Sequence, residues 1–142
     1  MFQFDPYRRW SLLHWMICRI SDGIYNESIM GFLRDGVFRY HFPGLARINQ
    51  EYPEAKGATD FIGLNYYSNL LLSPLAKTEP PFTPLIRKGQ VLTDMPYATY
   101  PEGFYRALMK ISELGRPIIV TENGVPDAKD EFIREDYIRR YL

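Results

Sequence analysis

Apolar positions near the start of the chain follow helical spacing and predict two helices. Residues 8–21 carry four apolar side chains at that spacing: Trp10, Leu13, Ile17 and Ile20. A second helix is predicted from about residue 24 to residue 35, with Asp22 as a candidate N-cap and Gly36 as its end. The segment 60–67 is different, because it is a short run of mostly apolar and aromatic residues. This segment predicts a β-strand.

The second half of the chain predicts a long connection followed by a helix, a strand and a helix. Five prolines between residues 68 and 100 exclude a regular helix there, and a connection of that length often lies over a functional site. Pro101 suits the first position of a helix that ends near Gly115. The β-branched run 117–121 predicts a strand that leads directly into Glu122. The last segment is predicted to be a charged helix with a buried stripe of four residues: Ile133, Tyr137, Ile138 and Tyr141.

This order of elements is a βαβ pattern, which implies parallel strands joined by a right-handed connection. Alternation along the first strand puts Asn65 and Tyr67 on one side, and alternation along the second groups Glu122 with Ile118 and Val120. If the strands are neighbours, about 4.8 Å apart, Asn65, Tyr67 and Glu122 meet at their carboxyl ends. That edge is where α/β folds bind ligands. A phenol there can hold a carboxylate in position to attack an electrophilic carbon.

The spacing alone leaves a simpler interpretation open for each of these residues. Glu122 is equally explained as the first polar residue after a buried strand, or as a cap for the turn at Asn123-Gly124. Asn65 is equally explained as a strand-end or turn residue, and Tyr67 as a core aromatic with its hydroxyl at the surface. The pattern therefore identifies a candidate site without assigning its chemistry.

Four stretches resemble, in the same order, the glycoside hydrolases of family 1, the β-glucosidases and their relatives. Residues 121–124, Thr-Glu-Asn-Gly, resemble the family's nucleophile motif, and residues 60–67 resemble its sixth barrel strand. Residues 100–104 resemble the start of the following helix, and residues 4–6, Phe-Asp-Pro, the segment after the fifth strand. The resemblance implies an α/β fold in which residues 1–142 form an incomplete TIM (β/α)8 barrel domain. About strands 6 and 7 of the barrel, with their helices, are expected.

The resemblance also implies hydrolysis of β-glycosides in two steps, with retention at the anomeric carbon. One carboxylate attacks that carbon, while a second, about 5 to 5.5 Å away, protonates the leaving oxygen. Glu122 matches the nucleophile. Asn65 and Tyr67 match positions that line the innermost sugar subsite, with Tyr67 as the hydrogen-bond partner of the nucleophile. A β-glycoside or oligosaccharide is the expected substrate. Tyr97 is a mild departure, because relatives commonly have Trp there.

The acid/base carboxylate is missing from the chain. The family carries it in an Asn-Glu-Pro motif on the fourth strand, and no Asn-Glu-Pro occurs here. The one Asn-Glu pair, Asn26-Glu27, is followed by Ser28 and is interpreted as a solvated position of the second helix. His14 and His41 offer no substitute, because helix packing or a loop position explains each of them better.

Composition narrows the classes of partner. Seventeen basic residues balance seventeen acidic ones, so neither nucleic acid nor an anionic membrane is an expected partner. Cys18, the single cysteine, lies in an apolar run and is interpreted as a small buried side chain. The first residues show no leader or membrane-spanning pattern, which predicts a soluble, cytoplasmic protein. Without a ligand-spaced His/Cys cluster or a glycine-rich phosphate loop, neither a metal nor another cofactor is expected.

Three hypotheses follow from the short length. A complete (β/α)8 barrel needs about 250 residues. Two parallel strands leave open edges and uncovered side chains, including Ile118 and Val120, so the isolated chain is predicted to fold poorly, aggregate or depend on a partner. The favoured hypothesis is the C-terminal-side portion of a β-glycosidase that is inactive alone. The others are half of a split enzyme completed by a complementary chain, and a non-catalytic carbohydrate-binding or scaffold protein with an incomplete pocket.

Overall fold

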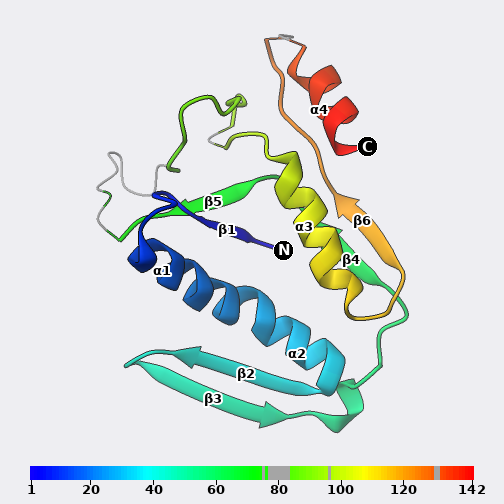
Figure 1. Ribbon diagram of the computed structural model, residues 1–142. Helices are drawn as coiled ribbons and strands as arrows, with labels where there is room; N and C mark the ends of the chain where they lie inside the picture. The colour runs from blue at the N-terminus through cyan, green and yellow to red at the C-terminus, as the bar shows by residue number, and fades with distance from the viewer. Residues whose placement is uncertain (75, 77–83, 96, 130–131) are drawn as a thin grey trace.

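The computed structural model describes residues 1–74, 76, 84–95, 97–129 and 132–142. Within this part of the chain, short strand pairs are arranged beside a set of helices (Figure 1). The elements in chain order are β1 (Gln3–Pro6), α1 (Leu12–Asp22), a π-helical turn (Gly23–Glu27), α2 (Ser28–Asp35), β2 (Val37–Phe42), β3 (Ala46–Glu51), a 3-10 turn (Pro53–Ala55), β4 (Ile62–Asn65), β5 (Asn69–Leu72), α3 (Pro101–Ser112), β6 (Ile118–Glu122) and α4 (Ile133–Tyr141).

The first two helices run on as one rod instead of being separated at Asp22. The π-helical turn Gly23–Glu27 joins α1 to α2. Asp22 has helical backbone angles and makes no capping hydrogen bond, so the predicted N-cap is wrong. Its carboxylate instead accepts hydrogen bonds from Asn26 at 2.6 Å and from Lys110 at 2.5 Å. The predicted end at Gly36 is confirmed, because Gly36 takes a left-handed conformation with φ 71°.

Strands β2 and β3 form an antiparallel hairpin that the sequence pattern did not predict. Pro43 and Gly44 make its turn: Gly44 has φ 76°, and the Leu45 N–H donates to the Phe42 carbonyl at 3.1 Å, as in a type II turn. Strand β2 lies beside α2, while β3 is the outermost strand (Figure 1). The prediction that His41 lies in a loop is wrong, because it lies within β2.

Three parallel segments form the sheet region of the fold. Strand β1 pairs with β5, and β4 pairs with β6, in both cases parallel. Only residues 66–68 separate β4 from β5, so these two strands are halves of one interrupted strand. The Asn65 carbonyl accepts from the N-terminal ammonium at 2.9 Å, while the next N–H, of Tyr66, donates toward β6. Strand β1 and β6 therefore lie at opposite edges of the interrupted strand.

Strand β1 corrects two expectations from the sequence. Residues 4–6 lie within a strand and do not follow one, and the chain supplies a third parallel strand beyond the two expected. Strand β5 also begins inside the predicted connection 68–100. The described residues of that stretch contain no helix, as predicted, and residues 75, 77–83 and 96 lie outside the described part.

Helices α3 and α4 cover one face of the β4–β6 pair and bury an aromatic core. The core contains Ile62, Leu64 and Tyr66 from the strand side, and Phe104, Ala107, Ile111, Tyr137 and Tyr141 from the two helices. Burying each large side chain of this kind stabilises the fold by about 1.5 to 3 kcal/mol. The Tyr66 hydroxyl is satisfied by donating to the Tyr100 carbonyl at 2.8 Å. This packing holds the carboxyl ends of β4 and β6 in place.

The two helices match most of what their sequences predicted. Pro101 is the first residue of α3, and Gly115 follows its end with φ 64°. In α4, Tyr137 and Tyr141 are buried as predicted. Ile138 is 51% exposed, so its place in the predicted buried stripe is wrong.

Candidate active site

A bulge in β6 decides which way Glu122 points. Leu64 pairs with Val120, but the next residue, Asn65, pairs with Glu122, so Thr121 is an extra residue in β6. Side chains that are paired across two parallel strands point to the same face of the sheet. Simple alternation would put Glu122 on the face of Val120. The extra residue moves it to the face of Asn65.

The face of β6 that carries the site is therefore not the one that alternation predicted. Ile118 packs against the core under α3 and α4, and Val120 shares that face because it pairs with the buried Leu64. The prediction that both side chains are uncovered is therefore wrong for Ile118, whereas Val120 is 41% exposed, as predicted. Thr121 lies on the uncovered side, where its side chain is 3.4 Å from the position that a Cβ on Gly63 would occupy. A glycine at position 63 leaves the room that this side chain needs.

The structure brings Asn65, Tyr67 and Glu122 together at the carboxyl ends of the two strands. The Tyr67 hydroxyl donates to Glu122 Oε2 at 3.1 Å. The Thr121 hydroxyl donates to Asn65 Oδ1 at 2.5 Å. Because Thr121 uses the oxygen of the Asn65 side chain, the amide NH2 is the group of Asn65 that can donate to a ligand. The sequence had not singled out Thr121, whose role depends on the bulge.

The hydrogen bond between Tyr67 and Glu122 sets the protonation of the phenol. This bond raises the pKa of Tyr67 above its ordinary value, with burial and the negative charge of Glu122 acting in the same direction. Ionised Tyr67 would place a second negative charge beside the carboxylate and would lose the bond. Tyr67 therefore remains a hydrogen-bond donor to Glu122 over the whole neutral range.

The turn after β6 is held by its own residues and does not need Glu122 as a cap. The Asn123 side chain donates to the Tyr66 carbonyl at 2.7 Å. The Gly124 N–H donates to the Tyr137 hydroxyl at 3.2 Å. The side-chain hydrogen bond of Glu122 runs to Tyr67 instead of to this turn.

Tyr97 adds an aromatic wall beside the site. Its ring centroid lies 6.0 Å from that of Tyr67, and its hydroxyl donates to the Gly124 carbonyl at 3.5 Å. An open cavity of about 350 Å³ adjoins these rings, with Asn65, Tyr67 and Tyr97 in its lining; Glu122 stands outside this lining. A cavity of this size falls in the range of small-ligand sites.

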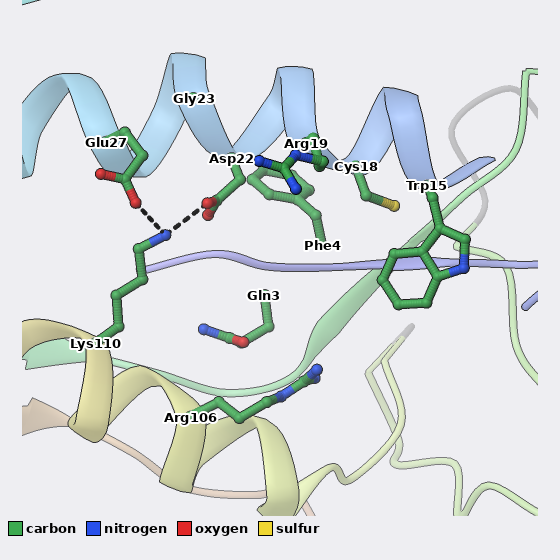
Figure 2. A pocket seen from close by; sticks show the side chains of 10 residues that line it. All are labelled: Gln3, Phe4, Trp15, Cys18, Arg19, Asp22, Gly23, Glu27, Arg106 and Lys110. Carbon is green, nitrogen blue, oxygen red and sulfur yellow. Dashed lines mark hydrogen bonds and ion pairs between the residues drawn. The ribbon is translucent and has the colours of Figure 1, made fainter. Parts of the chain in front are cut away.

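A second cavity, of about 620 Å³, lies between α1, β1 and α3 (Figure 2). Figure 2 shows Lys110 reaching from α3 to Asp22 and Glu27, with its Nζ 2.5 and 2.6 Å from their oxygens. Burial disfavours the ammonium, but these two carboxylates outweigh it and raise the pKa of Lys110. The charges of Lys110, Asp22 and Glu27 are thus paired with one another, and none of the residues that line this cavity lines the cavity beside Tyr67.

Of the Asn-Glu pair in the sequence, Glu27 lines this second cavity and Asn26 does not. Asn26 is buried, donates to the Phe2 carbonyl at 2.8 Å and accepts from the Phe2 N–H at 3.2 Å. Glu27 is ion-paired with Lys110. The interpretation of this pair as a solvated helix position is therefore wrong for Asn26, whereas Glu27 is exposed, as expected. Neither residue belongs to the site at the strand ends.

The remaining candidates for chemistry have packing roles. His14 is buried in α1, with its ring nitrogens 2.7 Å from Ser11 Oγ and 3.0 Å from Ser73 Oγ, so its predicted helix-packing role is confirmed. Cys18 is buried as predicted, and burial raises the pKa of its thiol to about 11. Across the described ranges, no group of three His, Cys, Asp or Glu side chains is placed to hold a metal. Nor do those ranges contain a helix with the length and apolar character needed to cross a bilayer.

Comparisons with known proteins give the site its context. Residues 5–142 match the model of the family described as glycosyl hydrolase family 1. The β-galactosidase of Pyrococcus woesei is 28% identical over 137 residues, which cover 84% of this chain and 25% of the relative. β-Glucosidase A of Thermotoga maritima is 29% identical over 119 residues, which cover 82% of this chain and 24% of the relative.

Solved structures agree with the family match. The β-glycosidase from Pyrococcus horikoshii superposes with a TM-score of 0.70 at 26% identity, over 99% of this chain and 32% of that one. The family 1 β-glucosidase from Thermotoga maritima shares the fold, with a TM-score of 0.66 over 99% of this chain and 35% of that one. The chain spans about a quarter of the length of these curated relatives and forms an α/β part of a TIM-barrel architecture. With almost all of its residues matched by the family model, this chain belongs to glycosyl hydrolase family 1.

Proposed function

We propose that this chain is the C-terminal-side portion of a retaining β-glycosidase and that Glu122 is its nucleophile. The observation that carries the proposal is the hydrogen bond from Tyr67 to Glu122 Oε2, made at the carboxyl ends of two adjacent parallel strands. In a (β/α)8 barrel that end carries the catalytic residues. The printed names of the relatives, a β-galactosidase and a β-glucosidase, support β-linked glycosides as the substrate class.

In this proposal each side chain has a separate task in the reaction. Tyr67 holds one oxygen of Glu122, which leaves the other to attack the anomeric carbon. A glycosyl ester forms, and the bond to the leaving oxygen breaks as that oxygen takes a proton from a second carboxylic acid. The same second group, now a base, removes a proton from water, and the hydroxide attacks the anomeric carbon and frees Glu122. Asn65, oriented by Thr121, donates to a sugar hydroxyl.

The order of the strands supports a position in the barrel. In this proposal the interrupted strand β4–β5 is the sixth barrel strand and β6 is the seventh. Strand β1 lies on the other side of the interrupted strand and precedes it in the chain, so it takes the place of the fifth. This assignment keeps about strands 6 and 7 from the sequence interpretation and adds the strand that the sequence missed.

The second carboxylate is expected to come from residues outside these 142, because the Asn-Glu-Pro motif is absent from them. The chain alone is therefore expected to be inactive. A longer polypeptide or a complementary chain would supply the missing group, together with the strands that close the barrel. The loops that select the sugar and the aglycone would come from the same source.

The first test is to translate the DNA on both sides of this reading frame and search upstream for an Asn-Glu-Pro strand. The completed protein, or this chain mixed with a chain that carries the missing strands, is then assayed with aryl β-glucosides and β-galactosides. We expect activity that Glu122→Gln lowers by at least a thousandfold. Glu102→Gln, at an exposed position of α3, serves as the matched control and should leave the rate unchanged. Activity that survives Glu122→Gln would remove Glu122 from the nucleophile role.

A second readout follows the covalent intermediate directly. A 2-deoxy-2-fluoro glycoside with a good leaving group should label the completed enzyme once per site. The fluorine slows both formation and breakdown of the glycosyl ester, but the good leaving group keeps formation fast, so the ester accumulates. Peptide mass analysis should place the label on Glu122. A label on any other carboxylate would contradict the assignment even if the protein hydrolyses glycosides.

Sugar binding without hydrolysis is the second candidate, and the cavity beside Tyr67 and Tyr97 favours it. Aromatic faces of this kind stack on sugar rings. Saturable binding of a β-glycoside by the lone chain, abolished by Tyr97→Ala, would support this function. Binding that appears only in the completed barrel would leave hydrolysis as the better account.

A further inference from the structure

The outer edge of β3 is open. Strand β3 lies at the rim of the molecule, and its only strand partner among the described residues is β2 (Figure 1). All six of its side chains are exposed. A six-residue edge with unpaired N–H and C=O groups is a template for a further strand.

The hairpin register shows which backbone groups point outward. The Tyr52 N–H donates to the Gly36 carbonyl at 2.6 Å, and the Leu45 N–H donates to the Phe42 carbonyl, so even-numbered carbonyls of β2 point toward β3. The backbone N–H and C=O groups of the even-numbered residues of β3, which pair with these residues, point toward β2. Because the direction alternates along a strand, the N–H and C=O groups of Arg47, Asn49 and Glu51 point to the free edge.

These three residues form a self-complementary edge. If a second β3 runs antiparallel along the first, the register that uses all three places Asn49 opposite Asn49. The same register places Arg47 of each copy opposite Glu51 of the other. A shift by two residues in either direction loses one of the three pairs and both charge matches. Opposite charges directly across a strand pair stabilise it, while like charges in the same place destabilise it.

The side chains involved lie on one face of the hairpin. Arg39 pairs with Asn49 in the register and approaches Asp35 of α2, with 3.9 Å between Nη1 and Oδ2. Arg47 and Glu51 share the face of Arg39, since residues two apart point to the same side. Arg47 of one copy and Glu51 of the other would therefore lie on the same face of a sheet formed by pairing the two β3 edges.

We propose that β3 pairs antiparallel with β3 of a second copy of this chain, around a two-fold axis at Asn49. The product is a four-stranded sheet in the order β2, β3, β3, β2, with α2 of both copies on the same face. The partner is a second copy and not an unrelated strand, because the charge pattern of β3 is complementary to itself under two-fold symmetry. This inference does not depend on the proposed glycosidase function. The contact is small, so the dimer forms at high protein concentration.

The proposed register allows a disulfide between the two copies of position 49 and excludes one between the two copies of position 48. In the dimer the two copies of position 49 lie opposite each other, with Cα atoms about 5.5 Å apart, within reach of a disulfide. The two copies of position 48 lie two residues out of step, at a Cα separation of about 8 Å, which is beyond that reach. Asn49→Cys and Ile48→Cys are therefore a matched pair in which both side chains are exposed. The parent chain, with Cys18 buried, is the common background.

The variants are oxidised with a mild thiol oxidant and run on a non-reducing gel. We expect at least fivefold more disulfide-linked dimer for Asn49→Cys than for Ile48→Cys or the parent chain. Equal cross-linking of the two variants, or none in either at millimolar chain, would overturn the proposal. Equal cross-linking would point to non-specific aggregation, and none to a β3 edge that stays unpaired or takes a different partner.

A charge exchange tests the same register without cysteines. Arg47→Glu should raise the dissociation constant measured by sedimentation about tenfold, because two opposite-charge contacts become like-charge contacts. Glu51→Arg should act similarly, and the two substitutions combined should restore association to within about twofold of the parent. The parent dimer should weaken as salt is raised. A double variant as weak as either single one would show that these residues do not face each other.

Discussion

The two faces of the β4–β6 pair differ sharply. On the face toward α3 and α4, Leu64 is 1% exposed and lies in a closed aromatic core. On the opposite face Tyr67 is 41% exposed and Ile119 is 48% exposed. The two helices cover the first face over β4, although Val120 of β6 is 41% exposed. The second face carries the candidate site and has no cover among the described residues. A parallel sheet normally has both faces buried, so the open face is the incomplete half of the scaffold.

Two carboxylates show the same difference at the level of single residues. Asp5 is 5% exposed and accepts two hydrogen bonds from Arg106, at 2.9 and 3.2 Å, and one from Asn69 at 2.8 Å. Burial favours its neutral form, but these bonds and the nearby guanidinium charges outweigh it and lower the pKa of Asp5. Glu122 is exposed and bonds to Tyr67. A carboxylate with all its bonds satisfied holds a fold together, while one with a free oxygen can react.

The largest expected effect separates the two faces directly. Leu64→Ala removes a buried side chain from the closed face and should lower the free energy of unfolding by about 3 kcal/mol. Ile119→Ala, on the open face of the same sheet, should cost less than about 1 kcal/mol in the lone chain. Urea unfolding followed by circular dichroism measures both. Equal losses would show that the open face is buried in solution.

The second effect tests Asp5 as a structural carboxylate. Asp5→Asn should cost about 2 kcal/mol at pH 7, because it leaves Arg106 without its charged partner. The folded-state pKa of Asp5 is lowered, so its contribution is present above the unfolded value of about 3.9 and is lost as pH falls through the folded value. Stability measured from pH 7 to pH 2 should therefore show the difference between parent and variant shrinking below about pH 4. Asp60→Asn, at an exposed position, is the control and should change the free energy of unfolding at pH 7 by less than about 0.5 kcal/mol.

A smaller effect concerns the polar bond inside the aromatic core. Tyr66→Phe removes the hydrogen bond to the Tyr100 carbonyl and should cost about 1 kcal/mol in unfolding free energy. Tyr105→Phe, on the exposed side of α3, is the control and should change stability by only a few tenths of a kcal/mol. If the two variants behave alike, the Tyr66 hydroxyl contributes nothing that water does not replace.

The smallest effect lies on the open face and leaves stability nearly unchanged. Glu122→Gln removes the negative charge that favours protonated Tyr67, so the pKa of the Tyr67 phenol should fall toward its ordinary value. A pH titration of ring-labelled tyrosine by NMR reads this shift for the Tyr67 resonance. The Tyr97 resonance, shifted chiefly by burial, should move much less. An unchanged Tyr67 titration would mean that the bond to Glu122 does not persist in solution.

Local chemistry in the sequence was sufficient for several elements of this protein. Proline at position 101 and glycine at position 115 predicted the limits of α3 within a few residues, because each acts on the backbone at its own position. The short apolar runs around Leu64 and Val120 predicted β4 and β6. The Thr-Glu-Asn-Gly motif and its companions pointed to the family that the comparisons show. The meeting of Asn65, Tyr67 and Glu122 also followed from the order of elements.

Only the tertiary structure decided the face of β6 that carries Glu122, the third parallel strand and the hairpin. The bulge at Thr121 reverses the alternation and exists only because β6 is paired with β4. Strand β1 is four residues long, and it is a strand because it pairs with β5, which lies more than sixty residues away in the sequence. The helix continues through Asp22, and the side chain of Asp22 forms an ion pair with Lys110 of α3 instead of a cap. Pairing register and long-range ion pairs join distant segments, so no local pattern of hydrophobic and polar residues specifies them.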